Sequence, residues 1–263
     1  MRRLWRDVKL VAMVLNDGVS KHLLLLAGSG EARDIAARLT RWPDVRVTVS
    51  QLYESRTGLA FAQPTRLGGF GGAEGFEAFM REAGIDAVLD AAHPFAVRVG
   101  ARASRYCAKH GLAYARVLRP PWEAKAGDNW HEVPDEATAR AALRAGQRVF
   151  TTTGLSGIDT LTADPAIQFF VRRLRDDPVP DMPSHISFVH GVGPFSKEDE
   201  IATLRDLKID VLIVKNSGGT ASATKLEAAR ALDLPVILLA RPKQPDGRVL
   251  NSVAEALDWV AAL

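Results

Sequence analysis

The sequence predicts an α/β protein of two domains, each built on a parallel sheet, with a ligand cleft between them. Short apolar runs such as Leu23–Leu26 and Val211–Val214 are typical of strands buried on both faces of a parallel sheet. Segments with apolar residues at helical spacing separate these runs from residue 21 to the end of the chain. A chain of 263 residues has room for one large domain or two small ones.

The first domain is expected at residues 21–123. Its first strand is the leucine run, and the next helix carries Ile35, Ala36 and Leu39 at helical spacing. Prolines 120 and 121 end its last strand, because proline has no N–H to donate to a neighbouring strand. We expect strands at 22–27, 45–50, 65–68, 86–91 and 113–118, and helices at 31–40, 74–82 and 96–110.

The second domain is expected at residues 124–263, where the same alternation continues. We expect strands at 130–133, 148–152, 167–173, 185–190, 210–215 and 235–240, and helices at 135–145, 156–162, 197–207, 221–232 and 251–262. Residues 1–20 are predicted to be a poorly ordered extension. Their apolar run is interrupted by Lys9 and Asp17 and lacks a signal-peptide cleavage pattern, so we expect a cytoplasmic protein.

The composition argues against several kinds of function. The net charge of +3 is only mildly basic, and no Lys/Arg run is interleaved with aromatic residues, so nucleic-acid binding is not expected. Cys107 is the single cysteine, which excludes an intrachain disulfide and a cysteine-based zinc site. No metal-ligand spacing, nucleophilic triad or Walker A sequence is present, and the apolar runs are too short to span a membrane. We expect a monomer or homodimer with small-molecule partners.

A glycine turn follows the first strand. Gly28, Ser29 and Gly30 precede Glu31 and Ala32 at the start of a helix, where backbone N–H groups and the helix dipole favour an anion. This arrangement is typical of Rossmann-like domains that bind the pyrophosphate of a dinucleotide. The third glycine of that fingerprint is absent, since Arg33 occupies its position. A tight strand-to-helix turn without a ligand is the alternative.

The end of the second strand suggests which dinucleotide is bound. Ser50 ends this strand and Arg56 follows, and a hydroxyl with a guanidinium suits the 2′-phosphate of NADPH. Glu54 would favour NADH instead if it faced the ribose. The alternative without a ligand is a solvated loop in which Arg56 is merely exposed.

Two further segments of the first domain are candidates for contact with the cofactor. Four glycines lie between positions 68 and 72, and such backbone freedom suits a loop pressed against a ligand, although a flexible surface turn would look the same. We select Gly69, Gly71 and Gly72 for this role. His93 follows the fourth strand, so we expect it near the nicotinamide as a binding residue or a catalytic one. Asp90 could orient His93 or cap the following helix, and a purely structural histidine is the alternative.

The second domain has its own candidate anion site. Lys215 precedes a Ser217-Gly218-Gly219 turn that leads towards a helix, and Lys225 lies within that helix. Thr152, Thr153 and Gly154 follow another strand, and their hydroxyl and N–H groups could hold a carboxylate. The alternative for the threonines is capping of the next helix.

Together these motifs resemble the precorrin-6A reductase family of cobalamin biosynthesis, from residue 21 almost to the end of the chain. The resemblance rests on Gly28-Ser29-Gly30-Glu31-Ala32, Gly68-Gly69-Phe70-Gly71-Gly72, Asp90-Ala91-Ala92-His93-Pro94-Phe95-Ala96, Arg119-Pro120-x-Trp122, Thr152-Thr153-Gly154, Gly193-Pro194-Phe195 and Lys215-Asn216-Ser217-Gly218-Gly219. The chain departs from the family pattern at Ala27, Ser29 and Ala92, where Gly, Thr and Thr are usual.

The resemblance implies reduction of a ring double bond of precorrin-6A by NADPH, giving precorrin-6B. It places the cofactor in the first domain and the carboxylates of the tetrapyrrole in the second. Three alternatives stay open: a cobalt-precorrin-6A reductase of the anaerobic route that uses NADH, a non-catalytic nucleotide sensor, and a transferase that binds a UDP-sugar.

Overall fold

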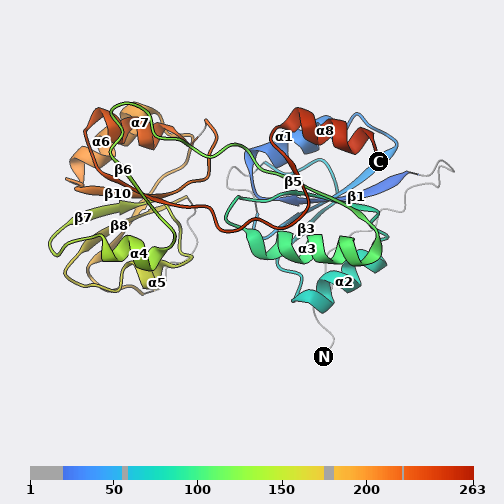
Figure 1. Cartoon of the computed structure of the whole chain (residues 1–263), viewed down its shortest axis with the longest axis horizontal. Coiled ribbons are helices and arrows are strands. Elements are labelled where there is room, and N and C mark those ends of the chain that lie inside the picture. The colour runs from blue at the N-terminus through green and yellow to red at the C-terminus, as the bar shows by residue number, and fades with distance from the viewer. Residues whose placement is uncertain (1–19, 55–58, 175–180, 221) are drawn as a thin grey trace. The chain divides into compact units, whose positions relative to one another are not determined.

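The computed structural model contains two six-stranded sheets with helices on both faces of each (Figure 1). It describes residues 20–54, 59–174, 181–220 and 222–263. Every strand pair in both sheets is parallel. The predicted α/β class is therefore confirmed.

The first sheet has the strand order β12-β5-β4-β1-β2-β3. Its helices lie in two pairs, with α1 and α8 on one face and α2 and α3 on the other (Figure 1). The strands are β1 (Lys21–Ala27), β2 (Val45–Gln51), β3 (Thr65–Leu67), β4 (Ala87–Ala91), β5 (Ala113–Val117) and β12 (Arg248–Leu250). The helices are α1 (Gly30–Leu39), α2 (Ala73–Glu82), α3 (Val97–His110) and α8 (Val253–Ala261).

The leucine run of β1 explains why this sheet is covered on both sides. Leu23 and Leu25 enter the core beneath α1 and α8, whereas Leu24 and Leu26 enter the core beneath α2 and α3. Successive side chains of a strand point to opposite faces, so a continuous apolar run requires two apolar layers. Ser29 is the N-cap of α1, and its side chain accepts a hydrogen bond from the N–H of Ala32.

The second sheet has the strand order β6-β11-β10-β7-β8-β9. Helices α6 and α7 cover one of its faces, and α4 and α5 lie on the other (Figure 1). The strands are β6 (Trp130–Val133), β7 (Arg148–Thr151), β8 (Gln168–Arg173), β9 (Ile186–His190), β10 (Val211–Lys215) and β11 (Val236–Leu239). The helices are α4 (Glu136–Ala141), α5 (Ile158–Leu161), α6 (Lys197–Asp206) and α7 (Thr224–Ala231).

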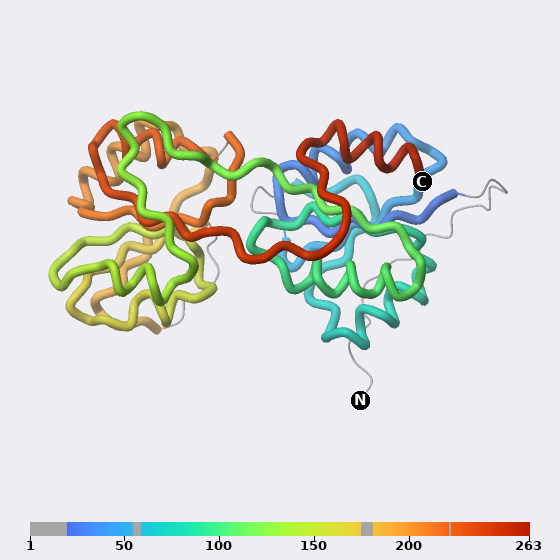
Figure 2. Tube along the Cα trace, viewed as in Figure 1, coloured from blue at the N-terminus to red at the C-terminus, as the bar shows by residue number. Residues whose placement is uncertain are grey.

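The division into two compact units differs from the predicted one at the end of the chain. One unit consists of two segments of the chain, the part up to Leu118 and Pro245–Leu263. The other unit is Arg119–Gln244. Figure 2 shows the red C-terminal segment among the elements of the first unit. The reason is β12, a strand that the sequence did not predict, which pairs with β5 and leads α8 onto the first sheet. The end of the predicted 124–263 domain thus belongs to the first unit.

Helices of the described residues are all too short or too polar to cross a membrane. Helix α4 is shorter than the predicted 135–145, because the chain leaves the helix after Ala141. The predicted extension at 1–20 lies outside the described residues except for its last position.

Candidate active site

The first candidate site lies where β1 and β4 adjoin in the first sheet. The chain continues from β1 to β2 on one side, whereas β4 lies on the other, so the loops after β1 and β4 diverge at a topological switch point. The Ser29 hydroxyl donates a hydrogen bond of 2.8 Å to the carbonyl of Ala91. A Cβ atom at Gly28 would lie 3.0 Å from the backbone N of His93. The structure thus brings the glycine turn and the His93 loop together.

Gly30 differs from Gly28 in its surroundings. It is the first residue of α1, and a Cβ atom built there would meet nothing within 4 Å. Glu31 lies in the first turn of the helix, and Ala32 is fully buried beneath it. The open space at Gly30 is therefore not needed for packing, and it suits the close approach of a ligand to the backbone at a helix N-terminus.

A buried ion pair between Asp90 and Arg116 supports the backbone of the His93 loop. Asp90 is 0% exposed, and its carboxylate accepts hydrogen bonds from the backbone N–H of Ala92, the Tyr114 hydroxyl and the Arg116 guanidinium. Arg116 also donates to the carbonyl of His93, at 3.3 Å. Burial raises the pKa of Asp90, although Arg116 opposes this shift. Asp90 thus fixes the backbone of the loop instead of orienting the imidazole or capping α3, whose N-cap is Ala96.

The imidazole of His93 has a defined hydrogen bond on one side. Its Nδ1 atom accepts from the backbone N–H of Phe95 at 3.3 Å. In the neutral ring this contact leaves the proton on Nε2, because only one of the two nitrogens carries a hydrogen. The His93 side chain is partly exposed at the carboxyl edge of the sheet, where it can meet a ligand.

A cationic group of β3, Arg66, lies beside the end of β2, and the sequence did not indicate it. Ser50 and Arg66 are register partners in β2 and β3, and Arg66 Nη1 donates to the Ser50 hydroxyl at 3.2 Å. The same guanidinium donates to the carbonyls of Gly68 and Gly69, at 2.7 and 2.8 Å. Gly71 and Gly72 both have positive φ, and Gly72 is the N-cap of α2. The register of the two strands is the signal that would have identified Arg66.

Two other residues, Arg56 and Glu54, were predicted to favour NADPH and NADH respectively, and neither distinguishes the two cofactors in the structure. Arg56 lies outside the described residues. Glu54 is described and exposed.

In the second unit, the loops after β7 and β10 also meet. The Lys215 ammonium donates to the carbonyl of Thr153 at 2.9 Å, and Glu136 Oε1 lies 3.9 Å from the same nitrogen. Burial lowers the pKa of Lys215, and Glu136 opposes this shift. Thr152 has a partly exposed side chain, and Gly154 has positive φ with open space around it. The threonines do not cap α5, because its N-cap is Gly157.

The Ser217-Gly218-Gly219 turn is clamped by residues distant in the sequence. Arg119 Nε donates to the carbonyls of Ser217 and Gly218, at 2.8 and 2.9 Å, and Arg241 also donates to the Ser217 carbonyl, at 3.0 Å. The Trp122 indole N–H donates to the carbonyl of Gly219 at 2.8 Å. A Cβ atom at Gly218 would overlap the carbonyl of Pro120, so only glycine fits there. Ser217 and Gly218 are buried, and this turn has a structural reason for its glycine that the sequence did not reveal.

Lys225 lies near this turn. Its ammonium donates to the carbonyl of Ser222 at 2.6 Å and lies 5.8 Å from the centroid of a Trp122 ring. Burial lowers its pKa to about 8, and the neighbouring charge of Arg172 contributes, against the opposing charge of Glu200. Arg172 itself is paired with Glu200 at 3.0 Å, and both side chains are buried. Lys225 is therefore the titratable cation of this cluster near neutral pH.

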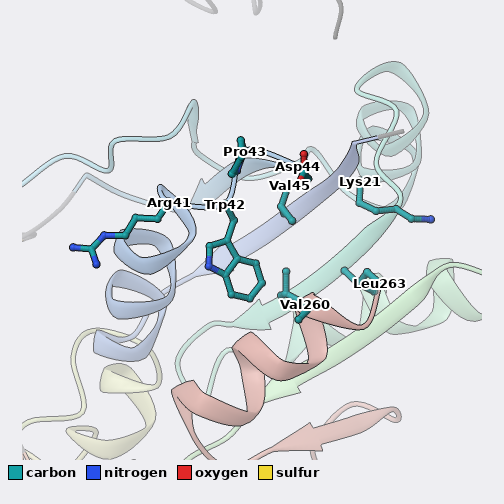
Figure 3. A pocket seen from close by; sticks show the side chains of 9 residues that line it. Lys21, Arg41, Trp42, Pro43, Asp44, Val45, Val260 and Leu263 are labelled. Atoms are coloured by element: carbon teal, nitrogen blue, oxygen red, sulfur yellow. The ribbon is translucent and has the colours of Figure 1, made fainter. Parts of the chain in front are cut away.

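A cavity of about 590 Å³ in the first unit is unrelated to these loops (Figure 3). Lys21 and Val45, at the amino ends of β1 and β2, line it together with Trp42, Val260 and Leu263. The candidate residues lie instead at the carboxyl ends of the strands, where ligands bind in open parallel sheets. Among the described residues, no cluster of His, Cys, Asp or Glu is arranged to hold a metal ion.

Comparison with known proteins identifies the family. Residues 22–261 match the family model CbiJ, described as precorrin-6x reductase CbiJ/CobK. The chain belongs to this family. A precorrin-6A reductase from Mycobacterium tuberculosis is 40% identical over 92% of this chain and 98% of its own length. A solved structure of CobK precorrin-6A reductase superposes with a TM-score of 0.80 at 34% identity, covering 92% of this chain and 96% of its own.

The family confirms the reductase activity expected from the motifs. A more distant relative is the cobalt-precorrin-6A reductase from Methanothermobacter thermautotrophicus, which is 31% identical over 84% of this chain and 76% of its own length. The non-catalytic sensor and the UDP-sugar transferase are disfavoured, because the chain matches reductases over nearly its whole length.

Proposed function

We propose that this reductase uses NADPH to reduce a ring double bond of precorrin-6A, giving precorrin-6B. The observation that carries the proposal is the open space at Gly30 beside the packed contact of Gly28 with the His93 loop. A turn that is tightly packed at Gly28 and leaves room at Gly30 suits a pyrophosphate at the start of α1. When bound, the nicotinamide supplies a hydride to the macrocycle.

The residues of the first unit have distinct roles in this proposal. Ser29 fixes the turn by bonding the carbonyl of Ala91 and the N–H of Ala32, and the N–H groups of Gly30 and Glu31 are proposed to face the anion. Ser50 provides a hydroxyl where an NAD-dependent domain would carry an acidic side chain, which supports NADPH over NADH. The glycine loop, with Gly69, Gly71 and Gly72, lets the backbone approach the cofactor closely.

His93 is proposed to contact the nicotinamide end of the cofactor. The ion pair of Asp90 and Arg116 holds its backbone, and the N–H of Phe95 holds Nδ1. In the neutral ring, the proton at Nε2 can hydrogen-bond to an acceptor or be donated to the macrocycle. Transfer to a carbon of the macrocycle would make His93 catalytic, and positioning alone would leave that step to water.

The second unit is proposed to hold the acetate and propionate groups of the tetrapyrrole. Lys215 and the hydroxyl of Thr152 supply charge and a hydrogen-bond donor. The hydroxyl of Thr153, also predicted from the sequence, is instead buried against that of Thr151, at 2.9 Å. The N–H groups of Gly218 and Gly219 add further donors, whereas the N–H of Ser217 already donates to the carbonyl of Lys215 at 2.6 Å. Positioning two large ligands is the main demand on the protein, since the cofactor carries the chemistry.

The direct test is a reduction assay with purified protein, precorrin-6A and either NADPH or NADH. The proposal predicts conversion to precorrin-6B with a clear preference for NADPH. Turnover of cobalt-precorrin-6A with NADH, and none of precorrin-6A, would instead establish the anaerobic reaction.

A further inference from the structure

The guanidinium of Arg66 lies at the carboxyl edge of the first sheet without an acidic partner among the described residues. Two buried arginines each have an acidic partner, since Arg116 binds Asp90 and Arg172 binds Glu200, and the partly exposed Arg230 binds Asp128. Arg66 is instead surrounded by neutral oxygen atoms, those of Ser50, Gly68 and Gly69. A half-buried cation without a counter-charge favours the arrival of an anion.

The geometry also holds the guanidinium plane in a fixed orientation. Its central carbon lies 3.9 Å from the centroid of the Phe70 ring and 5.6 Å from that of Phe79. Two backbone carbonyls and the Ser50 hydroxyl accept hydrogen bonds from the group, and within the described residues its remaining N–H donors are uncommitted. Burial lowers the pKa of Arg66, which reports the loss of water around the charge and not the approach of another charge.

The place of Arg66 in the sheet identifies the anion. In an open parallel sheet that binds a dinucleotide, the end of the second strand faces the adenosine ribose. Ser50 is the last but one residue of β2, in register with Leu26 of β1 on one side and with Arg66 of β3 on the other. A phosphate on the 2′ position of that ribose would meet the Ser50 hydroxyl and the Arg66 guanidinium together.

We propose that Arg66, with Ser50, recognises the 2′-phosphate of NADPH, and that the glycine loop is held in place by the same side chain. This inference rests on the proposed use of NADPH. It replaces Arg56, selected from the sequence, by a residue whose position in the strand register is defined. Arg66 is a specificity-determining residue here and takes no part in hydride transfer.

The test is the binding of 2′,5′-ADP and of 5′-AMP to the wild type, Arg66→Gln and Arg56→Gln, measured by titration calorimetry. Arg66→Gln keeps a planar, polar group on Phe70 but removes the charge. We expect it to weaken 2′,5′-ADP binding about 10- to 100-fold, the range for loss of charged hydrogen bonds, with 5′-AMP binding changed less than about threefold. Arg56→Gln should leave both affinities close to those of the wild type.

Arg66→Lys separates recognition from loop support. It should recover part of the affinity for 2′,5′-ADP, since a lysine keeps the charge but cannot form the planar double contact. Equal losses for both nucleotides in Arg66→Gln, or a selective loss in Arg56→Gln alone, would overturn the inference. A wild type that binds NADPH and NADH equally would refute the proposed cofactor instead, so the two failures are distinguishable.

Discussion

Replacement of Gly30 by alanine should weaken NADPH binding without destabilising the protein. A Cβ atom at this position meets no atom within 4 Å, and the φ angle of Gly30 is not positive, so alanine fits. Because alanine restricts the unfolded chain, we expect a gain of about 0.4–1 kcal/mol in the free energy of unfolding. For a chain of this size, that gain is a rise of up to about 4 °C in the melting temperature.

The loss in affinity follows from the backbone N–H groups at the start of α1. A methyl group there keeps a pyrophosphate from approaching them, and a hydrogen bond to a charged group contributes about 1.5–3 kcal/mol. We therefore expect the dissociation constant of NADPH to rise about 10- to 100-fold, and further in Gly30→Leu. Quenching of protein fluorescence on NADPH addition measures the constant, and thermal melting measures the stability.

Gly28→Ala is the matched control. Its Cβ atom would lie 3.0 Å from the backbone N of His93 and 3.3 Å from Cα of Ala92, so the His93 loop must shift by a few tenths of an ångström. This variant should lose stability as well as affinity. Unchanged NADPH affinity in a folded Gly30→Ala protein would refute the assignment of the cofactor to this turn.

Three further predictions concern charged and buried groups. The pKa of Lys225 near 8 means that its charge is present below that pH and lost above it. If Lys225 assists substrate binding, kcat/KM for precorrin-6A should fall above about pH 8 in the wild type, and Lys225→Met should lack this fall. Asp90→Asn leaves Arg116 buried and unpaired, so urea titration should show a loss of about 3 kcal/mol or more; a loss below about 1 kcal/mol would contradict the supporting role of the pair. Cys107 is 1% exposed and burial raises its pKa to about 12, so a thiol reagent should modify it only after unfolding; rapid reaction of the native protein would contradict this burial.

The sequence was sufficient for most of the fold because the central strands, such as β1, β4, β10 and β11, are buried on both faces. Continuous apolar runs such as that of β1 can be assigned without knowing their neighbours. Strand β12 was missed for the opposite reason: it has three residues, Val249 is 42% exposed, and its only signal is pairing with β5. The membership of residues 245–263 in the first unit depends on that pairing, and no local pattern predicts it.

The candidate site was predictable in its loops but not in its supporting contacts. The turns at Gly28–Gly30 and Ser217–Gly219 follow apolar strands, which is a local signal. In contrast, Arg241 donates a hydrogen bond to the carbonyl of Arg119, 122 positions away in the sequence. Arg66 becomes a candidate for ligand binding only because its strand places it beside Ser50. Contacts of this kind depend on tertiary structure, and a sequence pattern does not reveal them.

The most direct test of the central claim is kcat/KM for wild-type protein with precorrin-6A as substrate, measured with NADPH and with NADH. A cofactor site with Ser50 and Arg66 at the end of β2 predicts formation of precorrin-6B with at least about tenfold preference for NADPH, the smallest effect expected of a charged hydrogen bond to the 2′-phosphate. Equal efficiency with the two cofactors, or a preference for NADH, would contradict it.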